Sequence, residues 1–481
     1  MTQKLKNILK SKPFRKRFNK NNFFKKSCIK KNGKIMSLII KNALIHSKNK
    51  TSINSVFISN GKIKKIIKAN STEKIKADKI LDAKNKLLLP GGIDSHVHFR
   101  EPGMEFKGNW KSESRAAAAG GITTVIDMPN NIPSTTTAKN LDKKRKIAGK
   151  NSLVNFGFHF GAEKGKLNEI NKAKNFAGIK VFMGSSTGNM LLEEEKELEK
   201  VFKIAKKKNK IAVLHAEDEK IIKQNTENAK QKNWNNIKYH NKIRSTKAEV
   251  EAIKKALKIR KKVGNKIHFL HVSTKKGLQE IINAKKKGKG KISCEVCPHH
   301  LFLNEKDLKK LKNFGKMNPP LRTKKDNDFL WKNLLNGKID FVSTDHAPHL
   351  KKEKQKKFFD APSGVTGTET VYPLLLDQAG KKKMKMQRLT EVLCEKPAEI
   401  YGIKNKGKIQ KGFDADLVLV DLNKKWIIKN SLIHSKCNWT PFNGIKLQGK
   451  IASTIIDGKI VFNKGKFNNK FRGKEIEFQK T

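Results

Sequence analysis

Short apolar runs alternate with Lys- and Glu-rich, helix-like stretches from residue 93 to about residue 400, and this alternation restricts the possible folds more than any other feature. The apolar runs lie at 121–128, 154–160, 179–183, 211–215, 267–271, 291–296 and 341–343. Consecutive parallel strands need a crossover helix between them, so seven or eight such βα units predict a (β/α)8 barrel of the TIM type.

Both ends of the chain have the pattern of β-structure. Short alternating runs separated by Gly and Asn lie at 38–45, 55–58, 62–67 and 86–89, and similar runs return at 412–420 and 454–461. Neither end is large enough to bury a good core alone, so we expect the two to pack together. The predicted fold class is α/β, with a barrel over 89–404 and a small composite β-sandwich built from 36–88 and 405–475.

The first 35 residues hold thirteen Lys or Arg and no acidic residue. We expect residues 1–35 to be a basic extension outside the core. Because Met36 directly precedes the first apolar run, we interpret the extension as upstream sequence read through from a start site later than Met1. An acid-poor targeting peptide and a basic tail that touches nucleic acid are the alternatives.

The chain carries 107 Lys and Arg against 43 Asp and Glu, a formal charge of +64. Such an excess suggests nucleic acid or an anionic membrane as partner. It is spread over the whole chain as Lys, however, together with Asn and Ile, which A/T-rich codons favour. We therefore attribute it to genome composition and expect neither partner, since no apolar run approaches the ~18 residues that span a bilayer. Five cysteines fit a reducing compartment, and we expect the cytoplasm.

A His-Val-His motif follows the first expected barrel strand. Residues i and i+2 of a strand share a face, so His96 and His98 both point inward, at the carboxyl end where barrels of this type place their chemistry. Two imidazoles so placed can hold one metal ion. The alternative is a pair of core histidines.

Four further candidates lie at the ends of later runs. Lys180 sits inside an apolar run, where burying an ammonium is costly. One chemical solution is a lysine that loses its proton in a dry site and adds carbon dioxide, giving a carbamate whose two oxygens bridge two divalent cations. His215 and His271 each end a run and would supply nitrogen ligands to the second cation, and Asp345 closes the set.

In this order the set resembles the binuclear metal site of the amidohydrolase superfamily, in the cyclic-amidase branch that contains hydantoinases, allantoinases and dihydroorotases. The resemblance extends from about residue 36 to about residue 465. It implies two divalent metal ions, with zinc expected, bridged by carboxylated Lys180, and Asp345 as both a ligand and the catalytic acid–base group. Many single-function bacterial dihydroorotases use an aspartate as the bridging ligand, whereas residues 179–184 here follow the hydantoinase-like pattern.

Three segments resemble the dihydroorotases within that branch, namely 98–103, 128–130 and 345–349. By this resemblance Arg100, Asn130 and His349 would bind the carboxylate and the ring of the substrate. A guanidinium fork matches a carboxylate in two hydrogen bonds, and allantoinase-like sequences, whose substrate lacks a carboxylate, tend to carry Asn at this Arg position. Asn318 is a further expected contact, with a Pro-fixed turn as the alternative reading.

The resemblance implies reversible hydrolysis of the cyclic amide of dihydroorotate to N-carbamoyl-aspartate. The alternatives are an allantoinase, a dihydropyrimidinase or hydantoinase, and a non-catalytic scaffold relative, which we would expect to have lost at least one ligand. We expect a small-molecule substrate and a homo-oligomer whose size the sequence does not give.

The segment Cys294-Glu295-Val296-Cys297-Pro298-His299-His300 looks like half of a zinc site. A structural zinc needs four ligands, and no second Cys/His pair stands at a suitable spacing. We therefore interpret both cysteines as small packing residues of a strand.

Overall fold

The computed structural model describes residues 37–47, 50–73, 75–185, 190–288 and 291–479. The basic extension over 1–35 and the expected start at Met36 lie outside the described residues. Within the described ranges, no helix has both the length and the apolar character needed to cross a membrane.

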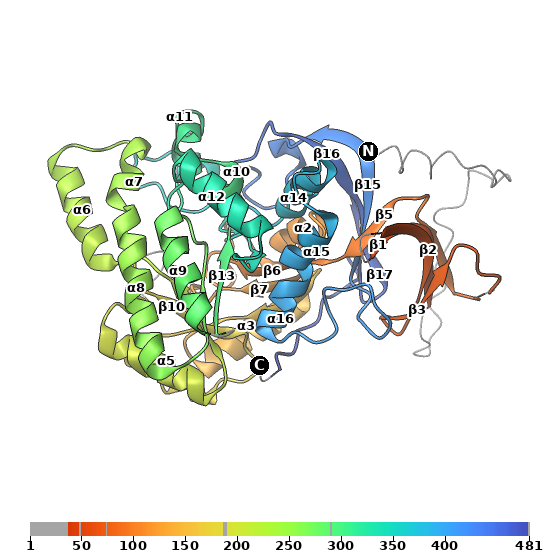
Figure 1. Ribbon diagram of the computed structural model, residues 1–481, viewed down its shortest axis with the longest axis horizontal. Coiled ribbons are helices and arrows are strands. Elements are labelled where there is room, and N and C mark those ends of the chain that lie inside the picture. Colours follow the sequence, from red (N-terminus) through yellow and green to blue (C-terminus); the bar gives the residue numbers. More distant parts are fainter. Residues whose placement is uncertain (1–36, 48–49, 74, 186–189, 289–290, 480–481) are drawn as a thin grey trace.

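Parallel strands form a closed barrel at the centre of the molecule (Figure 1). β8 and β9 are separated by His159 alone; β8 pairs with β7 and β9 with β10, so the two act as halves of one strand. The barrel closes where Val97 pairs with His346 and the His98 amide donates to the His346 carbonyl at 2.8 Å. The barrel strands are β6 (Gly92–Val97), β7 (Ile122–Asp127), β8 (Asn155–Phe158), β9 (Phe160–Gly161), β10 (Gly178–Phe182), β11 (Ile211–His215), β12 (Ile267–Phe269), β13 (Ile292–Val296) and β14 (Phe341–Val342).

Helices surround the barrel, and their apolar faces pack on the strands. The α-helices are α2 (Trp110–Ala119), α3 (Ala138–Asn151), α4 (Glu169–Lys172), α5 (Glu195–Lys207), α6 (Glu219–Gln231), α7 (His240–Ile243), α8 (Thr246–Val263), α9 (Lys275–Gly288), α10 (Pro298–Phe302), α11 (Leu308–Leu311), α12 (Lys324–Leu335), α13 (Lys351–Lys354), α14 (Val371–Gly380), α15 (Met386–Thr390) and α16 (Lys396–Tyr401). Single turns of other helix types are η1 (Ile237–Tyr239), η2 (Glu305–Asp307), η3 (Lys312–Gly315), η4 (Glu391–Glu395) and η5 (Asn430–Leu432).

A nine-stranded sheet joins the two ends of the chain in the order β18-β17-β16-β15-β5-β1-β2-β3, with β4 beside β1. Figure 1 shows the N-terminal strands, in red and orange, beside the blue C-terminal strands. The sheet strands are β1 (Leu38–Ser47), β2 (Lys50–Ser59), β3 (Lys62–Lys68), β4 (Lys79–Asp82), β5 (Leu87–Pro90), β15 (Leu417–Ile427), β16 (Lys446–Ile456), β17 (Lys459–Asn463) and β18 (Lys466–Phe467).

The central pairing of this sheet is β5 between β1 and β15, so a strand of the N-terminal segment pairs directly with a strand of the C-terminal segment. Side chains from both segments share one buried cluster, which includes Ile40, Ile58, Leu419 and Ile455. The predicted fold class, a (β/α)8 barrel with a small composite β-domain made from both chain ends, is therefore confirmed. The β4 strand was not predicted.

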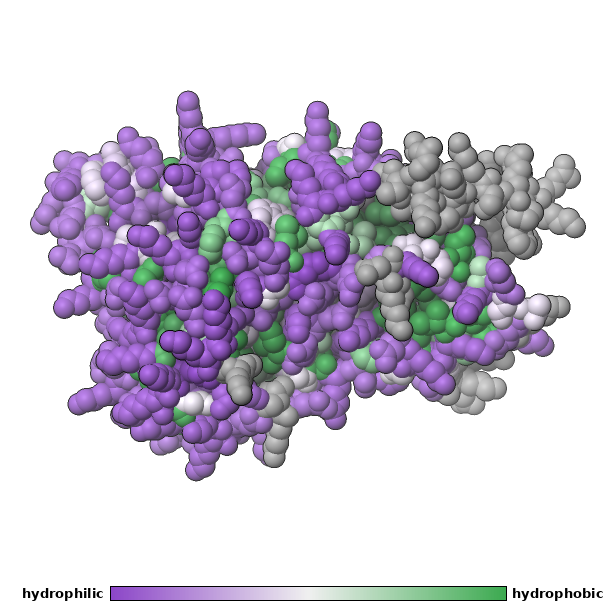
Figure 2. Space-filling model, in the orientation of Figure 1, coloured by the Kyte–Doolittle hydropathy of each residue, from purple (hydrophilic) through white to green (hydrophobic). Residues whose placement is uncertain are grey.

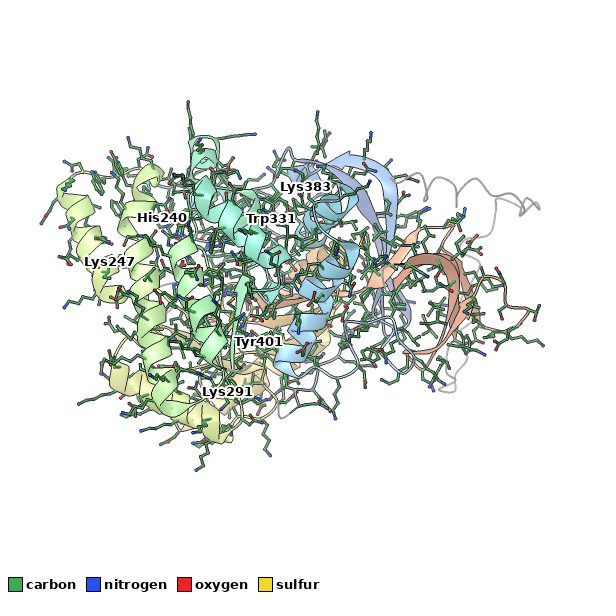
Figure 3. All side chains as sticks on the ribbon, in the orientation of Figure 1. His240, Lys247, Lys291, Trp331, Lys383 and Tyr401 are labelled. Atoms are coloured by element: carbon green, nitrogen blue, oxygen red, sulfur yellow. The ribbon has the colours of Figure 1, made fainter. Side chains whose placement is uncertain are left out.

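The positive charge lies largely on the outer surface. Figure 2 shows the helical part of this face covered by hydrophilic side chains. In Figure 3 the labelled Lys247, Lys291 and Lys383 are exposed, whereas the labelled His240 and Tyr401 are buried. The Lys-rich stretches therefore form solvated faces of barrel helices.

Candidate active site

The residues that the sequence placed at the ends of successive strands meet at one end of the barrel. His96 lies in β6, Lys180 in β10 and His215 at the last position of β11. His271 and Asp345 follow β12 and β14 by two and three residues. Because the strands are parallel, their carboxyl ends share one rim of the barrel, and these side chains converge there.

Asp345 lies among three of the candidate histidines, His96, His98 and His271. Asp345 Oδ1 lies 3.2 Å from His96 Nε2 and 3.0 Å from His98 Nε2. The ligand atoms of His96, His271 and Asp345 all lie within 4.8 Å of one another, and all three residues are buried. Two imidazole nitrogens and a carboxylate oxygen are a donor set that suits zinc and similar divalent cations.

Neighbouring side chains decide which nitrogen of each imidazole faces Asp345. His96 Nδ1 lies 2.6 Å from Glu295 Oε1, and His98 Nδ1 lies 2.5 Å from Asn130 Oδ1. The Asn130 amide oxygen only accepts, so His98 Nδ1 carries the proton and His98 Nε2 turns an unprotonated lone pair toward Asp345. Glu295, in its ionised form, places the proton of His96 on Nδ1 in the same way. Such a second hydrogen bond is the usual device that orients a metal-binding imidazole.

A second imidazole pair lies beside the first. His215 Nδ1 is 2.9 Å from His271 Nε2, and the His271 ring centroid is 5.3 Å from that of His96. His215 Nε2 lies 3.0 Å from Glu217 Oε2, which also accepts from Arg244 at 2.6 Å. Glu217 thus orients His215 as Glu295 orients His96.

Burial keeps these imidazoles in their neutral form. Desolvation lowers the pKa of His98 and His215, and it lowers the pKa of His96 and His271 well below the ordinary value. Neutral imidazole is the form that binds metal. The geometry and the protonation of the set therefore both fit divalent cations.

Lys180 is buried in β10, which pairs with β11, the strand that ends at His215. Burial lowers the pKa of its ammonium to about 7, although the negative charges of Asp345 and Glu295 oppose that shift. A substantial fraction of this amine is therefore neutral near pH 7, and a neutral amine is the form that can add carbon dioxide.

Arg100, Asn130, Asn318 and Asp345 line one cavity over this cluster. Gly364 also lines it; its φ is +142°, and a Cβ there would lie 2.8 Å from the Ala347 carbonyl. A side chain at this position would therefore clash with the Ala347 backbone, which also lines the cavity. Asn318 Oδ1 contacts His240 Nε2 at 3.1 Å.

His349 lies against Arg100 rather than beside the imidazoles. Its Nε2 is 3.0 Å from Arg100 Nη2, and its Nδ1 is 3.1 Å from Lys107 Nζ. A neutral imidazole has one acceptor nitrogen, so only one of the two cations can donate to it. If Lys107 donates to Nδ1, then Nε2–H donates to the Ser363 carbonyl at 3.1 Å. Arg100 Nε donates to the Pro348 carbonyl at 3.1 Å, and Nη2 then remains for another acceptor.

Several residues of the site were missed by the sequence analysis. Glu295 and Glu217 orient histidines, and Lys107 contacts His349, paired in turn with Glu353 at 2.8 Å. Glu295 could have been found, because it is an acidic residue inside an apolar strand run, the same signal that singled out Lys180. No comparable signal marks Lys107.

The sequence matches the profile described as amidohydrolase family over residues 87–461. Among curated proteins, it is 40% identical to a dihydroorotase of Methanosarcina acetivorans over 448 residues, which cover 91% of this chain and 95% of that protein. It is 37% identical to a dihydroorotase of Pyrococcus horikoshii, over 89% of this chain and 93% of that protein.

Among solved structures, the chain resembles an L-hydantoinase (dihydropyrimidinase) from Arthrobacter aurescens with a TM-score of 0.87 and 31% identity, covering 92% of this chain and 99% of that one. A dihydropyrimidinase from Brevibacillus agri gives a TM-score of 0.85 at 26% identity, with the same coverage. The likeness thus extends over the barrel and the β-domain alike.

Proposed function

The chain belongs to the amidohydrolase family, and we propose that it acts as a dihydroorotase at the rim where its metal-binding side chains converge. It is a metal-dependent cyclic amide hydrolase with a small-molecule substrate. The reaction is the reversible opening of the dihydroorotate ring to N-carbamoyl-aspartate, which in reverse closes the ring in pyrimidine biosynthesis.

The observation that carries the choice of substrate is the buried Arg100 guanidinium in the wall of the cavity. Burial lowers its pKa to about 10, so it keeps its charge at neutral pH. A buried cation beside the reaction centre favours a substrate that brings a carboxylate, which dihydroorotate has and hydantoin and allantoin lack. Asn130, Asn318 and His349 would complete the substrate contacts.

We assign the metal ligands as the sequence predicted. His96 and His98 would hold one cation, His215 and His271 the other, and the carbamate of Lys180 would bridge the two, with Asp345 beside the first. The nitrogen and oxygen donors are consistent with zinc. When bound, the two cations would polarise the scissile carbonyl and make water a stronger acid.

The residues of the chain supply the remaining chemistry. Arg100 binds the substrate carboxylate and thereby places the ring amide over the imidazole cluster. The Asp345 carboxylate takes a proton from the attacking water and delivers it to the ring nitrogen as the amide bond breaks. In the closing direction the same carboxylate moves the proton the opposite way.

Replacing the proton carrier tests this assignment. We expect Asp345→Asn to lower kcat for dihydroorotate by about 10²- to 10⁴-fold while the protein retains most of its metal, because the amide cannot accept the proton. Asp328→Asn, at an exposed α12 position, is the matched control and should keep wild-type turnover. An Asp345→Asn variant with wild-type rates would show that another group moves the proton.

A comparison of substrates tests the choice within the family. Ring opening should be faster with dihydroorotate than with hydantoin, dihydrouracil or allantoin at equal concentration. A preference for one of these uncharged rings would assign the chain to the hydantoinase or allantoinase activity instead.

We further propose that the protein works as a cytoplasmic homo-oligomer. Analytical ultracentrifugation would test the oligomeric state, and cell fractionation would test the compartment.

A further inference from the structure

A second cluster of candidate metal-binding side chains shares no residue with the cluster around Asp345. It consists of Cys297, which precedes α10, and of His299 and His300 in the first turn of that helix. Their ligand atoms all lie within 4.8 Å of one another, and all three residues are buried. The sequence pattern does not distinguish Cys294 from Cys297, but only Cys297 belongs to this cluster. Cys294 Sγ lies 3.9 Å from the Lys338 carbonyl.

The imidazoles of this cluster have unused nitrogens. Among the described residues, both ring nitrogens of His299 and the Nδ1 of His300 are buried without a hydrogen-bond partner. Leaving a buried polar atom unpaired is destabilising, so three such atoms side by side indicate a missing partner for their lone pairs or protons. Burial lowers the pKa of His299 well below its ordinary value and that of His300 to about 4, so both rings are neutral.

Hydrogen bonds to neighbouring residues orient the His300 ring and hold its backbone. Its Nε2 lies 3.1 Å from the Pro319 carbonyl, which fixes the proton there and leaves the Nδ1 lone pair turned inward. Its backbone carbonyl accepts from Asn327, and Trp331 Nε1, labelled in Figure 3, donates to the next carbonyl at 2.7 Å. Helix α12 therefore holds the first turn of α10 in place.

We propose that Cys297, His299 and His300 bind a thiophilic divalent cation such as Zn²⁺ at a site separate from the one around Asp345. Tetrahedral zinc places Sγ and nitrogen ligands about 3.3–3.6 Å apart, so small rotations of the three side chains close the observed separations. Solvent supplies the fourth ligand, as at zinc sites with three protein ligands.

Binding of the cation exchanges the thiol proton of Cys297 for the metal ion. The S–H bond of Cys297 breaks, a bond forms between Sγ and zinc, and the proton passes to solvent, so that one proton is released for each cation bound. The site connects to the main cluster through Glu295, two residues before Cys297, which orients His96. Its cation would brace the strand end that holds this carboxylate.

The test uses the full chain loaded with Co²⁺ in place of zinc. Thiolate coordination to Co²⁺ gives a charge-transfer absorption in the near-ultraviolet, whereas a site of nitrogen and oxygen ligands gives none. We expect this band in the wild-type protein, its loss in Cys297→Ser, and its retention in Cys294→Ser, the matched control. Metal analysis should show one equivalent fewer zinc per chain in Cys297→Ser.

His299→Gln is the second variant, used in case Cys297→Ser disturbs the strand end; it should weaken the band and lower the zinc content without touching the thiol. A wild-type cobalt protein without the band, or a band and a zinc content unchanged in Cys297→Ser, would overturn the proposal. Neither readout depends on turnover, so failure of the dihydroorotase assignment would leave this result unaffected.

Discussion

At the level of single residues, three members of the candidate site lie on backbone with positive φ. The angles are +71° at Arg100, +35° at His271 and +48° at Asp345. Non-glycine residues adopt this region at a cost, and active sites are among the places where a fold imposes it. Each of the three lies two or three residues beyond the end of its strand, β6, β12 or β14, at the rim of the barrel. Residue type marked these positions in the sequence, but the backbone turn did not.

The carboxylate preference is a property of Arg100 and can be measured there. Arg100→Lys removes the planar fork while keeping the charge, so we expect kcat/KM for dihydroorotate to fall by about 10- to 100-fold, mainly through KM. Ring opening of hydantoin, which has no carboxylate, should change much less. Steady-state kinetics with both substrates checks this.

Arg472→Lys, at an exposed position, serves as the control for the loss of a guanidinium. If Arg100→Lys lowers kcat/KM equally for both substrates, then Arg100 supports the fold of the site and does not bind the substrate carboxylate.

The low pKa of Lys180 leads to a pH dependence. A lysine whose pKa is about 7 is about 10% neutral at pH 6 and about 90% neutral at pH 8. Because only the neutral amine adds carbon dioxide, reactivation of the metal-stripped protein by zinc at constant dissolved carbon dioxide should become faster as the pH rises from 6 to 8 and then level off. Activity recovered with time, together with the mass of the Lys180 peptide, measures the step.

Lys210→Met is the matched control, since burial lowers the pKa of Lys210 to about 8 at a position outside the cluster. It should leave the pH profile of reactivation unchanged. Reactivation independent of both pH and carbon dioxide would argue against a carbamate at Lys180.

At the level of elements, the spacing of apolar residues and the local composition located most strands and helices within a few residues. The apolar run at 211–215 coincides with β11, and the Lys/Glu stretch at 248–262 lies within α8. The run at 154–160 proved to be two short strands, β8 and β9, because β7 pairs with its first half and β10 with its second half. Hydrophobicity alone does not carry that information.

Helix α8 offers a prediction at this scale. Ser245 caps its N-terminus by accepting from the Ala248 amide, and Gly264 ends it with φ +77°. Ser245→Ala leaves one amide without its partner, so we expect a loss of about 1 kcal/mol in the free energy of unfolding, measured as a lower urea midpoint. Thr246→Ala changes a neighbouring hydroxyl that is not the cap and should have a smaller effect. Equal urea midpoints for both variants would show that the Ser245 cap does not stabilise the protein.

At the level of the whole molecule, β5 ties the two ends of the chain into one sheet. Removal of a core side chain on the C-terminal side should therefore destabilise the N-terminal strands as well. Leu419→Ala, in the shared cluster at 3% exposure, should cost about 2–5 kcal/mol without adding a second transition to thermal unfolding.

Ile427→Ala on the same strand is the control, because Ile427 is 38% exposed and should cost much less. A separate early transition in Leu419→Ala, followed by calorimetry, would show that the β-domain unfolds independently of the barrel.

The sequence by itself determined the barrel class, the composite β-domain and the order of the candidate ligands from His96 to Asp345, because periodicity and residue type act over a few neighbouring positions. The metal-binding roles of those residues remain predictions. Only the tertiary structure decided that Glu295 and Glu217 orient the imidazoles, that Lys107 competes with Arg100 for His349, and that Cys297 lies with two histidines. Glu295 and Lys107 lie far along the chain from the histidines they contact, and the turns after β11 and β13 decide where Glu217 and Cys297 point, so neither kind of contact follows from a local sequence pattern.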